Sequence, residues 1–294
     1  MRVTIIHHND TDGWCAAAIA KMFLEAQGKE IKFIEMDYDR HNPYILSEYL
    51  VTSKEIYILD YSFSTEFMDE LCHGLGYENI IWIDHHKTAI EKLKNFSTLK
   101  GIRDVTKSAC LLTWEFFSPT PKQVPYPVRL IADRDIWKYD FGDDSRGFFE
   151  WGLFQDLTPQ SPLWSKLLSY SIDQTEPLIN EGLNFRKIRL HHCKKQIEKL
   201  GYEIDIEIEG KVYKALKMNS TAWESISDIG NMILTDFGYE VALMYYETGE
   251  ARIYQLRSKT VDVSAYARLH GGGGHKNSAG FMEMFEKPIA IPQK

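Results

Sequence analysis

The sequence predicts an α/β protein of two domains: a mostly parallel sheet with helices on both faces, and a smaller C-terminal α/β domain. Three observations lead to this prediction. The chain has 294 residues, whereas a single hydrophobic core usually stops growing at about 250–300 residues. Short runs rich in Ile, Val and Tyr alternate with helix-like segments through the first 140 residues, which is typical of βαβ units. A second alternation begins at about residue 203.

The first half of the chain contains four segments with the length and composition of buried strands. They are residues 3–8, 32–38, 55–62 and 79–86. Two helical segments lie between them: residues 14–28, which end at a glycine, and residues 64–76, which open with a Ser/Thr-x-x-Asp/Glu-like cap. Parallel sheets bind ligands beyond the carboxyl ends of their strands, so we expect the functional groups to lie there.

A Pro-rich stretch, residues 118–127, interrupts this pattern before a helix-like segment at 128–137. We expect the first domain to span 1–150, a helical linker to span 151–202 and the second domain to span 203–294. In the second domain the pattern predicts strands at 212–218, 239–247 and 251–258, helices at 227–237 and 261–270, and a closing segment GGGGHKNSAGF.

The composition is that of an ordinary globular protein, with a net charge of −8 from 34 basic and 42 acidic residues. Proteins that coat long nucleic acids are normally basic, so we expect a short substrate and no long duplex partner. The four cysteines lack Cys-x-x-Cys spacing, which argues against a zinc ribbon and a disulfide framework. Signal-peptide-like segments and runs of about 18 apolar residues are absent. We therefore expect a cytoplasmic protein with no membrane partner.

Predicted strand ends concentrate groups that bind hard metal ions, and the helix-like segment at 128–137 adds further acids. In chain order these groups are His8, Asp10, Asp12, Asp60, Asp84, His85, His86 and either Asp133 or Asp135. They should converge because parallel strands end at one edge of a sheet. Carboxylates together with imidazoles suit Mn²⁺ or Mg²⁺, and two ions about 3.5–4 Å apart can clamp a phosphoryl group. Strand alternation directs only one of His7 and His8 to this edge, and which one is left open.

The second domain carries a different feature. Gly271 to Gly274 precede His275 and a strand-like segment, and consecutive glycines let backbone N–H groups approach an anion closely. Arg257 and Ser258, at the end of the preceding strand, add a guanidinium and a hydroxyl that suit a phosphate. We interpret the combination as an anion pocket, with a plain flexible loop as the alternative.

These motifs are recognisable together. The chain contains, in order, HNDTDG, the single Asp in YILDYS, DHH and GGGGHKNSAGF. In these motifs it resembles DHH superfamily phosphoesterases with a C-terminal DHHA1 domain, such as nano-RNases that act as oligoribonucleases. The resemblance covers nearly the whole chain. It implies two α/β domains with the active site in the cleft between them.

The resemblance also implies roles for individual residues. Two ions would be ligated by His8, Asp10, Asp12, Asp60, His85 and Asp133, with Asp135 as the alternative to Asp133. Asp60 would bridge the ions, and Asp84 would orient an imidazole. Charge on the phosphoryl oxygens would be stabilised by the catalytic residues His86, Arg257 and His275. The substrate would be held by Arg257, Ser258, Gly273, Gly274 and His275.

The implied activity is metal-dependent hydrolysis of phosphodiester or phosphomonoester bonds in short oligonucleotides or nucleotides, such as a bisphosphonucleotide. Mn²⁺ is the expected cofactor and Mg²⁺ the other candidate, with a hydroxide bridging the two ions as nucleophile. One alternative is a phosphodiesterase for cyclic or linear dinucleotides. Another is a non-catalytic nucleotide-binding regulator, against which the complete set of acids and histidines counts. Preference for RNA or DNA, and a homodimer, are left open.

Overall fold

The structure is a computed structural model that describes residues 2–37, 53–118, 123–220 and 226–286. Part of the Pro-rich stretch, residues 119–122, lies outside the described residues. The chain divides into two compact units, Met1–Arg186 and Lys187–Lys294. Each unit has a β-sheet of its own, so the predicted α/β architecture with two sheets is confirmed.

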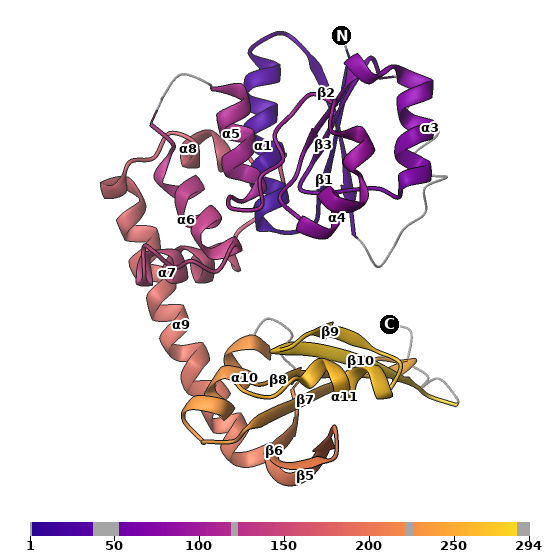
Figure 1. Cartoon of the computed structure of the whole chain (residues 1–294). Coiled ribbons are helices and arrows are strands. Elements are labelled where there is room, and N and C mark those ends of the chain that lie inside the picture. The colour runs from indigo at the N-terminus through magenta and orange to yellow at the C-terminus, as the bar shows by residue number, and fades with distance from the viewer. Residues whose placement is uncertain (1, 38–52, 119–122, 221–225, 287–294) are drawn as a thin grey trace. The chain divides into compact units, whose positions relative to one another are not determined.

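The first unit is built on a four-stranded parallel sheet with the strand order β2-β1-β3-β4 (Figure 1). Its strands are β1 (Arg2–His8), β2 (Glu30–Met36), β3 (Glu55–Leu59) and β4 (Ile80–Ile83). The side chains of β1, β3 and β4 are buried in near-continuous runs. Such runs require cover on both faces of the sheet.

Helices supply that cover on both faces. Successive strand residues point to opposite faces, so Ile5 and Ile6 enter different cores. One core includes residues of α1 (Thr11–Glu25) and α5 (Ala109–Phe117), and the other includes residues of α3 (Thr65–Leu75). Figure 1 shows α1 and α5 on one side of the sheet and α3 on the other. The further helices are η1 (Tyr77–Asn79), α4 (Lys87–Lys92), η2 (Lys94–Phe96), α6 (Tyr126–Asp135), α7 (Asp143–Gly152), α8 (Trp164–Leu167) and α9 (Ile172–Leu200).

The strand order creates a topological switch point between β1 and β3. The chain passes from β1 to β2 on one side and then to β3 and β4 on the other side. His7 pairs with Leu59 in the β1–β3 ladder, so His8 and Asp60 follow at neighbouring positions. The crevice outside the carboxyl ends at such a point is where open α/β sheets bind ligands.

The second unit contains a six-stranded sheet in the order β5-β6-β7-β8-β10-β9, in which only the β6–β7 pair is parallel. Its strands are β5 (Tyr202–Ile208), β6 (Lys211–Asn219), β7 (Val241–Glu247), β8 (Ala251–Arg257), β9 (Gly273–His275) and β10 (Ser278–Met284). Leu243 and Leu256 face a core with α11 (Val263–Leu269), whereas Ala242 and Met244 face a core with α10 (Ile226–Thr235).

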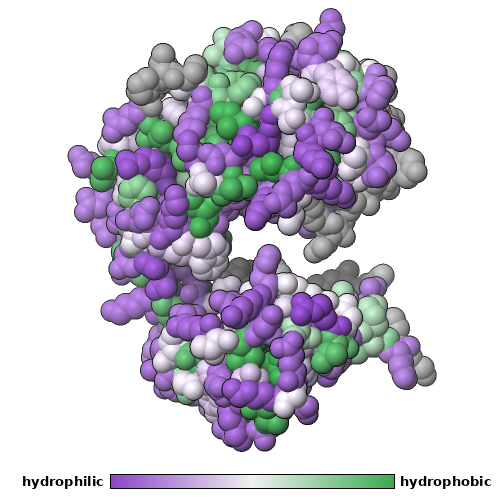
Figure 2. All heavy atoms as spheres, viewed as in Figure 1, coloured by the Kyte–Doolittle hydropathy of each residue, from purple (hydrophilic) through white to green (hydrophobic). Residues whose placement is uncertain are grey.

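Sequence patterns did not reveal every element. β5, α5 and α7 were not predicted. α5 packs against α1 and α6, so apolar residues surround it and no helical period marks its sequence. On the face that Figure 2 shows, hydrophilic and apolar side chains are interspersed in both units. None of the described helices combines the length and the apolar character needed to cross a membrane.

Candidate metal centre

The candidate metal centre lies at the carboxyl edge of the parallel sheet. His8 is the last residue of β1, Asp60 directly follows β3, and His85 and His86 lie between β4 and α4. Three groups of side chains each bring their ligand atoms within 4.8 Å of one another. These groups are His8, Asp10 and Asp60; Asp60, His85 and His86; and Asp12, His85 and Asp135.

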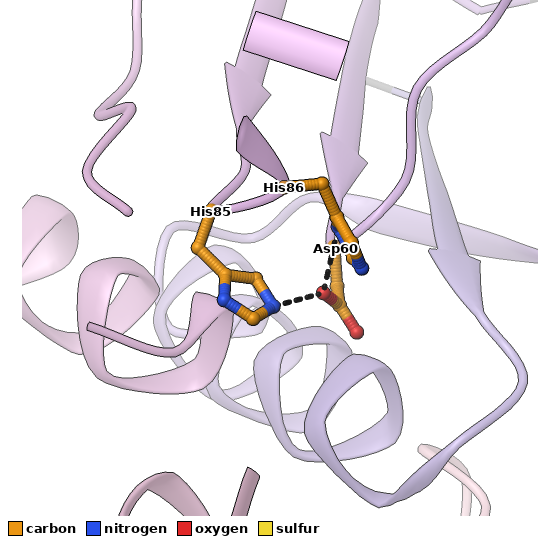
Figure 3. A group of neighbouring side chains, drawn as sticks. All are labelled: Asp60, His85 and His86. Atoms are coloured by element: carbon orange, nitrogen blue, oxygen red, sulfur yellow. Dashed lines mark ion pairs between the residues drawn. The ribbon is translucent and has the colours of Figure 1, made fainter. Parts of the chain in front are cut away.

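Asp60 is the carboxylate that joins the groups. Its Oδ1 lies 3.3 Å from Nε2 of His85 and 3.8 Å from Nδ1 of His86 (Figure 3), and its Oδ2 lies 3.9 Å from Nδ1 of His8. The backbone of Asp60 is left-handed, with φ 56°, and its N–H donates to Ile83 O at 3.0 Å. A non-glycine residue in this region carries strain of about 1–3 kcal/mol, which is common at functional sites.

The turn after β1 presents His8 and Asp10 together. Nδ1 of His8 lies 2.9 Å from Asp10 Oδ2, while Asp10 Oδ1 accepts from Gly13 N–H at 2.9 Å as the N-cap of α1. A Cβ at Gly13 would meet His8 O at 2.4 Å, so only glycine permits this tight turn. His7, by contrast, is buried, and its Nδ1 contacts His8 O at 2.8 Å. His8 is therefore the histidine of this pair that faces the centre.

Asp12 and Asp135 approach the centre from two helices. The Asp12 carboxylate accepts from the N–H groups of Ala109 at 2.7 Å and Cys110 at 2.9 Å, at the start of α5. Its Oδ2 lies 3.9 Å from Nε2 of His85, and Asp135 Oδ2 lies 3.4 Å from the same nitrogen. Contacts between the start of α5 and the end of the first motif were not apparent in the sequence.

Asp133 has a different environment from Asp135. Its carboxylate accepts from Asp140 N–H at 2.7 Å, from Phe141 N–H at 3.2 Å and from the hydroxyl of Ser145. None of the three groups of described ligand atoms includes it. The structure therefore brings Asp135, the alternative at the fourth motif, into the centre in place of Asp133. Asp133 instead ties down the loop between α6 and α7.

Asp84 organises the two histidines that follow it. Its Oδ1 accepts from the N–H groups of His85 at 2.7 Å and His86 at 3.1 Å, and lies 2.8 Å from Nδ1 of His86. Its Oδ2 accepts from the Ser62 hydroxyl, which in turn accepts from Trp82 Nε1 at 3.1 Å. Ser62 carried no signal in the sequence, because a lone serine after a strand is usually a turn residue.

Negative charge accumulates in this buried cluster. Burial raises the pKa of Asp60 well above its usual range, and the neighbouring charges of Asp12 and Asp10 raise it further. Burial, again with Asp12 and Asp10, raises the pKa of Asp135 to about 9. Asp10 differs: although burial alone would raise its pKa, the hydrogen bond with His8 lowers it to about 2. The carboxylates repel one another unless a cation lies among them.

The donor set fits divalent cations. Asp60 Oδ1 and Asp135 Oδ2 are buried yet accept no hydrogen bond from the described part of the chain, a state that costs free energy unless a ligand compensates it. Ligand atoms about 2.1 Å from a common ion lie about 3 Å or more apart, and Nε2 of His85 has such separations from Asp60 and Asp135. Carboxylate and imidazole donors match Mn²⁺ or Mg²⁺.

The residues of the second unit that we expect to bind substrate differ in exposure and in hydrogen bonding. Arg257 Nη1 donates to Leu256 O at 2.9 Å, and the buried Ser258 hydroxyl donates to Glu240 O at 2.8 Å and accepts from Val261 N–H at 3.0 Å. Gly273 and His275 belong to β9, which pairs with β10, and His275 is exposed. The last two glycines of the run, Gly273 and Gly274, are thus part of a hairpin, and Ser258 is held in a turn.

Comparison with known proteins gives a family match for the first unit. Residues 2–133 match the family model described as "DHH family, N-terminal domain". The chain is 28% identical over 291 residues to an uncharacterized protein of Acanthamoeba polyphaga mimivirus, and the match covers 95% of this chain and 66% of that protein. The chain therefore spans just under two thirds of the length of this relative.

Two further proteins resemble almost the whole chain. The bifunctional oligoribonuclease and PAP phosphatase NrnA of Mycoplasma genitalium is 21% identical over 308 residues, which cover 98% of this chain and 91% of that protein. RecJ of Thermus thermophilus, solved in complex with Mn²⁺, aligns with a TM-score of 0.53 at 18% identity, over 97% of this chain and 50% of that chain. The likeness to RecJ shows a shared fold.

Proposed function

Because residues 2–133 match the DHH family N-terminal domain, we propose that this chain is a phosphoesterase that hydrolyses phosphoester bonds of short oligonucleotides or nucleotides with the help of divalent metal ions. The observation that carries the proposal is the environment of Asp60. This buried carboxylate has an oxygen that receives no hydrogen bond from the residues the structure describes, and it lies among histidines and further carboxylates at a topological switch point. The sequence similarity to NrnA supports a short nucleic-acid or nucleotide substrate.

Two ions would be held by residues of the first unit. One would contact His8, Asp10 and Asp60, and the other would contact Asp12, Asp60, His85 and Asp135. Asp60 would serve both ions. When bound, Mn²⁺ or Mg²⁺ would lower the pKa of water toward neutrality and offset the charge of a phosphoryl group. The imidazoles favour Mn²⁺ over Mg²⁺.

The adjacent histidines are suited to different tasks. Burial lowers the pKa of His85, which keeps its imidazole neutral, as metal ligation requires. The hydrogen bond with Asp84 raises the pKa of His86, and that favours the protonated form. A protonated His86 would stabilise negative charge on phosphoryl oxygens as it develops. Asp84 thus orients His86 and favours its charge.

The second unit would bind the rest of the substrate. Arg257 and His275 are the residues we propose for contact with phosphate oxygens, and the glycines of the β9–β10 hairpin would allow close approach of the substrate. Arg257 should mainly affect KM, because a guanidinium on a phosphate that does not react binds ground and transition states alike.

The experiment is an activity panel on the full-length protein after chelation and reloading with Mn²⁺, Mg²⁺ or Ca²⁺. The substrates are dinucleotides, five-nucleotide RNA and DNA, an adenosine bisphosphate, cyclic dinucleotides and pyrophosphate. We expect hydrolysis of short nucleic acids or nucleotides with Mn²⁺ and none without metal. Full activity in a preparation that elemental analysis shows to be metal-free would refute the proposal. Selective cleavage of cyclic dinucleotides would replace the substrate class.

A further inference from the structure

Three aromatic residues lie close in sequence to the candidate ligands, and the structure separates them by exposure. Tyr61 is fully buried. Trp14 is half-buried in α1, and its Nε1 donates to a glutamate at 2.9 Å. Trp137, two residues after Asp135, keeps 63% of its surface exposed. Core packing therefore accounts for the presence of Tyr61, but it does not account for that of Trp137.

The backbone that carries Trp137 is unusual. Trp137 and Tyr139 have φ values of 57° and 54°, in the left-handed region that bulky side chains rarely adopt. The surrounding contacts must hold them there. Asp133 does so, because its carbonyl accepts from Lys138 N–H at 3.0 Å and its carboxylate accepts from Asp140 N–H at 2.7 Å. The loop is thus fixed through its backbone, while the indole stays largely outside the core.

This loop borders the candidate metal centre. On one side, Asp135 Oδ2 lies 3.4 Å from Nε2 of His85. On the other side, Lys138 Nζ donates to Thr106 O at 3.4 Å. Thr106 lies just before the start of α5, where the N–H of Ala109 donates to the Asp12 carboxylate. Trp137 therefore lies in sequence between Asp135 and Lys138, which both contact residues at or next to the centre.

The loop also presents a second ring and a cation. Trp137 and Tyr139 form an edge-to-face pair with ring centroids 5.6 Å apart, and the Arg146 guanidinium lies 4.5 Å from the Tyr139 ring centroid. Exposed aromatic faces with neighbouring cations are the surfaces on which nucleobases stack. A substrate made only of phosphate, or of sugar and phosphate, would make no use of them.

We propose that Trp137 stacks on a base of the substrate and makes the centre selective for phosphoesters that carry a nucleobase. This inference rests on the proposed function and specifies its substrate class. Stacking acts on bound substrate before and during reaction alike, so Trp137 should affect KM more than kcat. Asp133 acts as a positioning residue, because it holds the loop without contacting substrate.

The test compares two substrates on the full-length, Mn²⁺-loaded protein: the dinucleotide pApA, and the same sugar-phosphate backbone without bases. We expect Trp137→Ala to raise KM for pApA about 5- to 100-fold, the range typical of alanine substitution at stacking residues. KM for the abasic compound should not change. Trp137→Phe should retain most of the affinity. Phe154→Ala is the matched control, because Phe154 is 66% exposed in the same unit and is not near the ligands in sequence.

The outcomes separate this inference from the proposed function. If the wild type cleaves pApA and Trp137→Ala leaves its KM unchanged, the stacking role is wrong and the function stands. Equal losses on both substrates would also overturn it, because they would indicate a role unrelated to the base. If the wild type cleaves neither compound, calorimetric binding in Ca²⁺ decides. A preference for pApA that depends on Trp137 supports stacking without hydrolysis, and no such preference overturns it.

Discussion

The carboxyl edge of the first sheet and the β8–β10 region of the second unit both contain residues that the motifs singled out, but they differ in how their polar groups are satisfied. At the sheet edge, Asp60 Oδ1 and Asp135 Oδ2 are buried without a donor from the described residues. In the second unit, Ser258 uses its hydroxyl to close a turn, and Arg257 donates to its neighbouring carbonyl. A buried polar group that the fold leaves unsatisfied indicates a ligand more strongly than a motif residue that the fold already engages.

The same contrast separates two acids that are only two positions apart. Asp133 receives two N–H groups and a hydroxyl, as a residue that stabilises a loop does. Asp135 lies against His85 and shares the negative potential of the cluster. If the contrast is sound, each acid should respond to substitution in a different measurable quantity.

The largest effect should come from Asp60→Asn. Asparagine tolerates the left-handed backbone at this position, so the change removes the charge and leaves the turn intact. We expect activity to fall by about 10³-fold or more, because one carboxylate serves both proposed ions. Metal content measured by elemental analysis should fall with it. Asp69→Asn, on the exposed face of α3, is the control. A variant that keeps a third of the wild-type rate would show that Asp60 acts only in the turn.

Asp135→Asn and Asp133→Asn should separate metal binding from stability. We expect Asp135→Asn to lower activity by about 10²-fold or more and to weaken metal binding. Asp133→Asn should keep the metal content but lose about 1–3 kcal/mol of unfolding free energy, because buried donors lose their acceptor. Calorimetric metal titration and urea unfolding measure the two quantities. Loss of metal in Asp133→Asn alone would restore Asp133 as the ligand.

Two adjacent glycines test the hairpin of the second unit. A Cβ at Gly274 would meet Ala279 Cα at 2.6 Å, and its φ is 132°, whereas a Cβ at Gly273 meets nothing within 4 Å. We expect Gly274→Ala to cost about 1–3 kcal/mol of stability and Gly273→Ala to change it by less than about 0.5 kcal/mol. Urea denaturation measures both. If Gly273→Ala is stable yet hydrolyses oligonucleotides poorly, Gly273 contacts substrate. Equal destabilisation would contradict the hairpin geometry.

The smallest effect should be the change in stability of the metal-free protein with pH. The pKa of Asp135 is raised to about 9, so the folded state keeps a proton that the unfolded chain releases above about pH 4. Stability in chelator should therefore fall as pH rises between these values. We expect Tm to be a few degrees lower at about pH 8.5 than at about pH 6. Asp135→Asn should show a shallower slope in scanning calorimetry. An identical slope would mean that Asp135 is ionised in both states.

The sequence by itself determined the α/β class and the convergence of the strand-end motifs. Both depend on local patterns. Short β-rich runs between helices predict a parallel sheet, and parallel strands place their carboxyl ends at one edge, whatever the rest of the chain does. His8, Asp10, Asp60 and His85 could be placed together for this reason, and the structure brings them there.

Only the tertiary structure decided between neighbouring candidates. Residues two positions apart on a helix point about 200° apart, so the packing of α6 determines that Asp135 faces His85 while Asp133 faces the loop before α7 and Ser145 in α7. The left-handed backbone at Trp137 likewise depends on tertiary contacts, because Asp133 binds the N–H groups of Lys138 and Asp140 that follow it. A sequence pattern records which groups are present along an element. The direction in which each one points is set by the elements packed against it.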